Sequence, residues 1–264
     1  MIINREKDSE ESRDCMQGIK ENPLGAAPVP RLMLKFAIPS IIAMLVGALY
    51  NIVDQLFIGQ AVGTLGNAAT NIAFPLSTSC LALALLFGIG GASCFNLTMG
   101  KGERETAAYY VGNAVSMLLI CGLTLAAISQ IFLTPLLRAF GAPNDVLPYA
   151  QDYVRITAFG FPFMLLTTGG GHLIRADGSP KMTMICNLTG AIINTILDAF
   201  FVMVLKMGMQ GAALATVIGQ VISALIVVIY MTRYKTVSLQ KKHFGVKWKY
   251  TKRIISIGTA SFFN

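Results

Sequence analysis

Apolar residues run along this chain in long blocks that short polar links separate. A helix needs about 20 apolar residues to cross the hydrocarbon core of a bilayer. The blocks that reach this length, and are therefore predicted spans, cover residues 33–58, 66–91, 107–133, 150–171, 182–205 and 210–231. A further apolar segment begins near Ile254 and continues to Asn264. The pattern predicts an all-α polytopic membrane protein with six complete transmembrane helices and the start of a seventh.

Composition supports the same class. The 264 residues are 54% hydrophobic and only 13% charged, and the mean hydropathy is +0.62. A soluble domain carries about 25% charged residues, which it needs to cover its surface. The composition therefore excludes a large soluble protein built from buried helices.

Positive charge is distributed unevenly between the links. If the N-terminus is cytoplasmic, all of the 21 Lys and Arg residues except Arg138, Arg155 and Lys206 fall on the cytoplasmic side. Cytoplasmic links are enriched in Lys and Arg in membrane proteins. We therefore expect a multi-pass protein of the plasma membrane with a cytoplasmic N-terminus. The net charge of +8 then faces anionic lipid rather than nucleic acid.

These features divide the chain into four parts. Residues 1–30 form a charged cytoplasmic arm without an apolar core, 31–232 hold the six spans, 233–253 form a basic cytoplasmic loop, and 254–264 begin another helix. The last segment stays apolar up to Asn264, and no polar link follows it in the sequence. We therefore expect the chain to be the first half of a protein about twice as long, and to be inactive in transport without the rest.

Of the 13 carboxylates, Asp152 lies near the outer end of the fourth predicted span, whereas Asp54 and Asp198 lie well inside the first and the fifth. A charge at the centre of a membrane helix costs about 2.5–3.5 kcal/mol on insertion scales. Both spans run outward, and both residues fall in the outer half of the bilayer, so the two carboxylates are expected to share one cavity. Asn51 precedes Asp54 by three residues and Asn194 precedes Asp198 by four, which places each amide on the face of its carboxylate.

A buried, protonatable pair of this kind is suited to ion coupling, by H⁺ or by Na⁺ held between Asp54 and Asp198. Hydroxyl groups from Tyr153 and Thr216 are candidates to join it. The alternative is that each Asp lies at a helix end and is hydrated by water. Pro39 removes a backbone donor inside the first span, and therefore either hinges or kinks it.

Three stretches together give the chain a specific resemblance. They are LMLKFAIPSIIAMLVGALYNIVDQLFIGQAVGTLGNAATNIAFP at 32–75, RADGSPKM at 175–182 and NTILDAFFVMVLKMGMQGAALATVIGQ at 194–220. In order and spacing they resemble the multidrug and toxic compound extrusion (MATE) family, in particular its DinF branch and MepA-like bacterial members. The resemblance extends over about residues 31–264.

The resemblance implies a fold of two six-helix lobes, of which this chain holds the N-terminal one, and a missing C-terminal lobe as its partner. It implies export of cationic and amphipathic drugs in exchange for H⁺ or Na⁺, with no cofactor and no resident metal. In the DinF branch an Asp of the first helix and Asn-x-x-x-Asp of the fifth line a cavity of the N-lobe, and these match Asp54, Asn194 and Asp198. The family's bending proline matches Pro39.

The family's Tyr and Thr of this network match Tyr153 and Thr216. The chain departs from the family's pattern at one place, because the family has an Asn in the fourth helix where Gly170 and Gly171 stand here.

Two alternatives to the antiporter stay open. One is a flippase for a lipid-linked precursor in the same superfamily, for which an anionic cargo would call for membrane-embedded cations. Only Arg155 comes close to that. The other is an intramembrane aspartyl enzyme that uses Asp54 and Asp198 as its catalytic pair. Neither Asp has a glycine-rich active-site stretch beside it, so we expect the protein not to be an enzyme.

Overall fold

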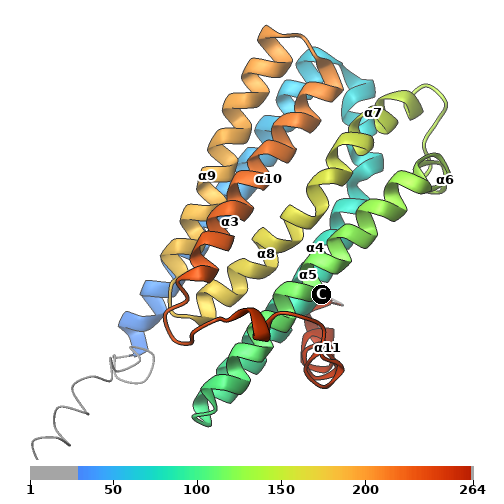
Figure 1. The fold of residues 1–264 in the computed structure, drawn as a ribbon. Coiled ribbons are helices and arrows are strands. Elements are labelled where there is room, and N and C mark those ends of the chain that lie inside the picture. Colours follow the sequence, from blue (N-terminus) through green and yellow to red (C-terminus); the bar gives the residue numbers. More distant parts are fainter. Residues whose placement is uncertain (1–28, 263–264) are drawn as a thin grey trace, which may run out of the picture. The chain divides into compact units, whose positions relative to one another are not determined.

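The computed structural model describes residues 29–262, and every regular element in that range is a helix (Figure 1). The elements are α3 (Val29–Ala61), α4 (Thr64–Gly100), α5 (Arg104–Ile131), α6 (Leu133–Ala139), α7 (Leu147–Thr157), η1 (Ala158–Gly160), α8 (Phe161–Ala176), α9 (Pro180–Asp198), η2 (Ala199–Val204), α10 (Gly208–Thr232), η3 (Lys241–His243) and α11 (Trp248–Phe262). Residues from Pro39 onward form one compact unit, and the packing described below is that of this unit. The predicted N-terminal arm lies almost entirely outside the described residues.

All six predicted spans are present as helical segments. Within the described range, helices long and apolar enough to cross a membrane cover Ala37–Ala61, Thr64–Gly100, Arg104–Ile131, Pro180–Val204 and Gly208–Thr232. The remaining predicted span, 150–171, is not one continuous α-helix. It is built from α7, a short 3₁₀ turn and α8. Pro162 lies in the first turn of α8, and proline has no N–H to continue the hydrogen bonds of a preceding helix.

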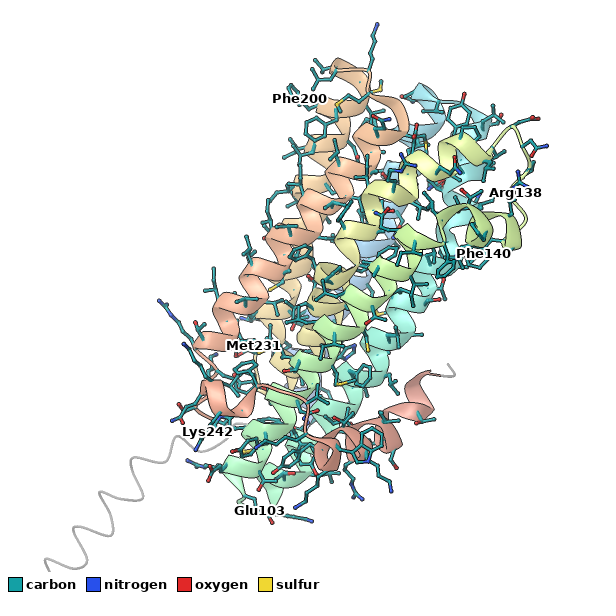
Figure 2. All side chains as sticks on the ribbon, turned by 45° about the vertical axis from the view of Figure 1, so that its right-hand side comes forward. Glu103, Arg138, Phe140, Phe200, Met231 and Lys242 are labelled. Carbon is teal, nitrogen blue, oxygen red and sulfur yellow. The ribbon has the colours of Figure 1, made fainter. Side chains whose placement is uncertain are left out.

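The helices alternate in direction, so their links gather at two opposite ends (Figure 1). Lys242 and Glu103 lie at one end, and Arg138 and Phe140 lie toward the other (Figure 2). The predicted cation-rich and cation-poor links therefore lie at different ends of the compact unit.

Small residues set the closest helix crossings. α4 packs against α5, α7, α8 and α11, and α9 packs against α8 and α10. A Cβ atom on Gly88 would lie 2.7 Å from the Cα of Gly169, and one on Gly219 would lie 2.9 Å from the carbonyl oxygen of Gly190. Close backbone approach through glycine is typical of helix pairs in membranes. Gly88 therefore allows α4 and α8 to approach each other closely.

Replacing Gly88 with leucine is expected to lower the free energy of unfolding by about 1–3 kcal/mol, the usual cost of forcing extra atoms into a packed contact. The obstruction at this site is the backbone of Gly169, which cannot move aside as a side chain would. Thermal unfolding of the purified chain in detergent measures the change. Gly100→Leu is the matched control, because a Cβ there would meet nothing within 4 Å. Equal melting of the two variants would refute this account of the α4–α8 contact.

The last described helix begins earlier than predicted. α11 starts at Trp248 rather than near Ile254, and it packs against α4 and α5. Residues 233–247, named the strap below, join α10 to α11 and include the short helix η3. The predicted basic loop 233–253 is therefore part strap and part helix.

Candidate ion and ligand site

The two carboxylates predicted to share a site come together in the structure. Asp54 of α3 is 6% exposed and Asp198, the last residue of α9, is fully buried. Their carboxyl groups lie close to each other. In the ionised form, neither carboxylate can donate a hydrogen bond to the other. Oδ1 of Asp54 and both oxygens of Asp198 also have no hydrogen-bond partner among the described residues. A buried acceptor pair without donors favours uptake of a proton or a small cation.

The backbone changes its hydrogen-bond pattern at Asp198. α9 ends there, and the next six residues, Ala199–Val204, form a π-helix. In a π-helix the backbone hydrogen bonds skip one residue more than in an α-helix, and such segments occur frequently at functional sites. Asp198 therefore lies at a junction between two helix types. Nothing in the sequence analysis pointed to this feature.

Polar side chains from other helices surround the pair. The amide Nδ2 of Asn194 donates a hydrogen bond of 3.4 Å to Oγ1 of Thr216 in α10. Asn194 also lies near Asp198, and its own Oδ1 has no hydrogen-bond partner among the described residues. The hydroxyl of Tyr153 in α7 lies within reach of Thr216 and close to both carboxylates. The structure thus brings together Asp54, Asn194, Asp198, Tyr153 and Thr216.

The structure does not bring Asn51 into this cluster. Its side chain is exposed, and Nδ2 donates to the carbonyl oxygen of Gly47 one turn earlier, at 2.8 Å. Tyr50, which is not among the predicted site residues, lies close to Asp54 and Asp198. Tyr50 precedes Asp54 by four residues, the same spacing that relates Asn194 to Asp198. On a helix, side chains four residues apart point in more similar directions than side chains three residues apart. The spacing of four could therefore have identified Tyr50 from the sequence.

A cavity of about 230 Å³ adjoins the cluster. Its lining includes Tyr50, Asn194 and Thr216 from the cluster, together with further uncharged polar side chains. These further side chains are Thr167, Thr168, Asn187, Gln220 and Ser223. No Lys or Arg side chain lines it among the described residues. A concave site with a few polar groups beside an ionisable pair is suited to a small ligand.

The glycines that replace the family's fourth-helix asparagine are packed rather than open. Gly170 and Gly171 are buried. A Cβ on Gly170 would lie 2.7 Å from Cγ1 of Val227, and one on Gly171 would lie 2.9 Å from Cγ2 of Thr183. No larger side chain fits at either place without a shift, and α8 contributes Thr167 and Thr168 to the cavity instead.

Fold and site together define a multi-pass helical membrane protein that buries an ionisable pair beside a polar cavity. This arrangement is typical of proteins that carry ions or solutes across membranes. A family model described as MatE matches residues 39–200. The chain belongs to the MATE family of multidrug efflux transporters. Members of this family are transporters rather than enzymes, so the aspartyl-enzyme alternative is rejected.

Individual relatives of this chain are also named as transporters. The multidrug export protein MepA of Staphylococcus haemolyticus is 29% identical over 233 residues, which are 88% of this chain and 52% of MepA. An FAD transporter of Shewanella oneidensis is 28% identical over 195 residues, 72% of this chain and 43% of the relative. Among solved structures, a MATE transporter in a bent conformation is 26% identical with a TM-score of 0.81, covering 88% of this chain and 52% of that one. The chain therefore spans about half the length of the relatives it matches.

Proposed function

We propose that this chain is the N-terminal lobe of a two-lobe antiporter that exports cationic and amphipathic compounds in exchange for H⁺ or Na⁺. The observation that carries the proposal is the buried pair Asp54 and Asp198 beside a cavity. Oδ1 of Asp54 and both carboxylate oxygens of Asp198 have no hydrogen-bond partner among the described residues. In the proposed orientation the N-terminus is cytoplasmic and the membrane is the plasma membrane. The second lobe is proposed because the relatives are about twice as long.

Coupling follows from competition for the same negative charge. A cationic cargo in the cavity is attracted by the carboxylates of Asp54 and Asp198. Protonation, or Na⁺ bound between them, neutralises the pair and weakens that attraction. A ligand moves a conformational equilibrium only by its different affinity for the two states. The ion therefore drives release of the cargo if the ion binds more tightly to the outward-open state than to the inward-open state.

Pro39 is the proposed hinge of this cycle. It lies inside α3, about four helical turns before Asp54 at 3.6 residues per turn. The missing N–H of a proline weakens the helix at that point. Bending of α3 at Pro39 would move Asp54 relative to α9, and would therefore change the distance between the carboxylates of Asp54 and Asp198.

The charge of the site favours a cation over an anion as cargo. The cavity lining holds no Lys or Arg among the described residues, and Arg155, the residue that a flippase for anionic lipid precursors would call for, is exposed. The relative named as an FAD transporter carries an anionic nucleotide by that name. A site with two carboxylates and no cation would repel such a cargo.

The experiment uses the complete transporter that the proposal requires, this chain together with its second lobe, in proteoliposomes. Ethidium uptake is followed under an imposed pH gradient, and then under a Na⁺ gradient. One of the two gradients is expected to drive uptake, and Asp54→Asn is expected to abolish it. The 264-residue chain reconstituted alone is the control, and is expected to transport no dye. Uptake by Asp54→Asn at the parent rate would refute the role of the pair.

A further inference from the structure

The strap is held to the helices by polar contacts rather than hanging free. Asp177, in the turn between α8 and α9, accepts hydrogen bonds from the backbone N–H groups of Lys235 and Thr236 at 2.8 and 3.0 Å. At the other end of the strap, Nδ2 of Asn113 in α5 donates to the carbonyl oxygens of Gly245 and Lys247 at 3.0 and 3.3 Å. The position of the strap is therefore fixed at both ends.

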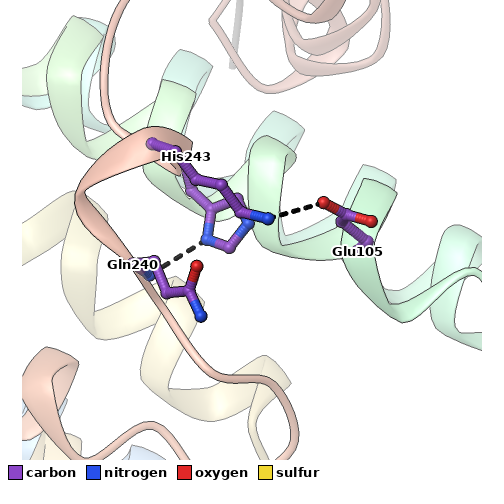
Figure 3. A network of polar contacts seen from close by, with 4 residues as sticks. Glu105, Gln240 and His243 are labelled. Carbon is purple, nitrogen blue, oxygen red and sulfur yellow. Dashed lines mark hydrogen bonds and ion pairs between the residues drawn. The ribbon is translucent and has the colours of Figure 1, made fainter.

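The middle of the strap forms an ion pair with the start of α5 and a hydrogen bond within itself (Figure 3). Lys242 forms an ion pair of 2.8 Å with Glu105, which raises the pKa of the Lys242 amine. The backbone N–H of Gln240 donates to Nδ1 of His243 at 3.0 Å. Burial lowers the pKa of His243, and the charge of Lys242 adds to that effect. His243 is therefore uncharged near neutral pH, and the positive charge of this region comes from Lys and Arg.

α11 has one buried face and one basic face. Thr251, Ile254 and Gly258 are buried against α4 and α5, and Oγ1 of Thr251 donates to Oδ1 of Asn113 at 2.7 Å. On the opposite side of the helix, at 100° per residue, lie the cations of the basic face. These are Lys249, Lys252 and Arg253, all exposed.

The basic face has no acidic partner nearby. No Asp or Glu occurs between residues 233 and 264, and the one salt bridge among the described residues is that of Lys242 with Glu105. Large apolar side chains that precede the cations in the sequence are exposed: Trp248 72%, Val246 49% and Phe244 40%. Exposed aromatic residues beside Lys and Arg are typical of helices that lie in the headgroup region of a membrane.

The contact of α11 with α4 lies about one bilayer thickness from the start of α4. The two helices touch where Gly90 meets the carbonyl oxygen of Ile254 and Gly258 meets that of Leu86. From Thr64 to Gly90, α4 extends about 40 Å at 1.5 Å per residue. A bilayer with its headgroup regions is about 40–45 Å thick. If Thr64 lies at one surface, α11 crosses α4 at the other.

We propose that α11 and the end of the strap form a binding surface for the headgroups of anionic phospholipids. Lys249, Lys252 and Arg253 contact the headgroups, and Trp248 inserts at the boundary with the acyl chains. The occupant is lipid rather than a second protein lobe because the face carries closely spaced positive charges, which anionic headgroups neutralise. The binding surface is separate from the carboxylate site and does not depend on the transport cycle.

Trp248 is the reporter for the test, because it is the single tryptophan of the chain. The 264-residue chain is placed in nanodiscs of phosphatidylcholine containing about one fifth phosphatidylglycerol. In one preparation the phosphatidylglycerol carries bromine on its upper acyl chains, and in the other an equal amount of the phosphatidylcholine does. Bromine quenches only a nearby tryptophan, so the ratio of the two quenching constants measures local enrichment of the anionic lipid. We expect a ratio of at least about two.

Substitutions separate charge from structure. The triple variant Lys249→Gln, Lys252→Gln, Arg253→Gln is expected to lower the ratio to about one. The charge-preserving variant Lys249→Arg, Lys252→Arg, Arg253→Lys is expected to keep the parent value. Because the three side chains are exposed, neither change disturbs the buried face. Raising the salt concentration to about 1 M, where the screening length is about 3 Å, is expected to lower the ratio without any substitution.

Two results would overturn the proposal. Equal quenching by the two brominated lipids in the unsubstituted chain would show that Trp248 meets the bilayer without selecting anionic lipid. No quenching by either lipid would show that the surface lies in water or is covered by protein. Neither result bears on antiport, since no transport is measured.

Discussion

Asp198→Asn, like Asp54→Asn, is expected to lower ion-driven transport by at least about 100-fold, to the background rate, and the double variant Asp54→Asn, Asp198→Asn is expected to lower it no further. The two carboxyl groups lie close together, so under the proposed function they bind the coupling ion as a unit. Residues that act as a unit give effects that do not add. Initial rates of ethidium uptake into proteoliposomes, with the complete transporter and the effective gradient, measure all three variants. Dye binding measured on the same variants distinguishes a loss of ion coupling from a loss of cargo binding.

The control for this experiment is a nearby carboxylate outside the cluster. Asp152 is exposed and directly precedes Tyr153 in α7, so Asp152→Asn tests the general effect of removing a negative charge from this region. Its rate is expected to stay within about twofold of the parent rate. If the losses of the two single variants multiplied in the double variant, Asp54 and Asp198 would act at separate steps. The shared-ion hypothesis would then be wrong.

The long helices and the pairing of the carboxylates were predictable from the sequence. Hydropathy over about 20 residues reports the transfer of a segment into lipid, and the spans follow directly from it. The helical repeat placed Asn194 below Asp198. Applied to Asp54, the same spacing of four residues identifies Tyr50, whereas the spacing of three led to Asn51, which bonds to its own helix.

The features that the sequence did not reveal depend on backbone hydrogen bonding and on contacts distant in the chain. The π-helix at Ala199–Val204 and the 3₁₀ turn at Ala158–Gly160 change which carbonyl each N–H reaches. Hydropathy is insensitive to that choice, because it sums side chains. The start of α11 at Trp248 also depends on packing against α4 and α5, and basic residues in a sequence do not show which of them a neighbouring helix will cover.

Asp177 is the clearest case of a residue whose importance only the structure reveals. The sequence places it in a polar turn, yet its side chain is only 4% exposed. Oδ2 accepts hydrogen bonds from the hydroxyl of Tyr230 at 2.6 Å and the N–H of Lys235 at 2.8 Å. Oδ1 accepts from the N–H and the hydroxyl of Thr236, at 3.0 and 2.6 Å. One carboxylate therefore joins the turn between α8 and α9, the end of α10 and the strap.

Asp177→Ala is expected to lower the free energy of unfolding by about 3–5 kcal/mol. A hydrogen bond to a charged group contributes about 1.5–3 kcal/mol, and removing the acceptor leaves buried donors unpaired. Chemical unfolding of the chain in detergent micelles measures the loss. Trypsin provides a local readout, because cleavage after the exposed residues Lys241 and Lys242 requires the backbone of the strap to enter the protease and is therefore faster when the strap detaches.

Asp145→Ala is the matched control for this prediction, since Asp145 is an exposed carboxylate in the turn between α6 and α7. A surface substitution of that kind is expected to change stability by no more than about 0.5 kcal/mol. Asp177→Asn keeps one acceptor oxygen but replaces the other with an amide that cannot accept. It is therefore expected to fall between the parent and Asp177→Ala. If Asp177→Ala unfolded like Asp145→Ala and the strap resisted trypsin in both, the strap would be held by its contacts with α5 alone.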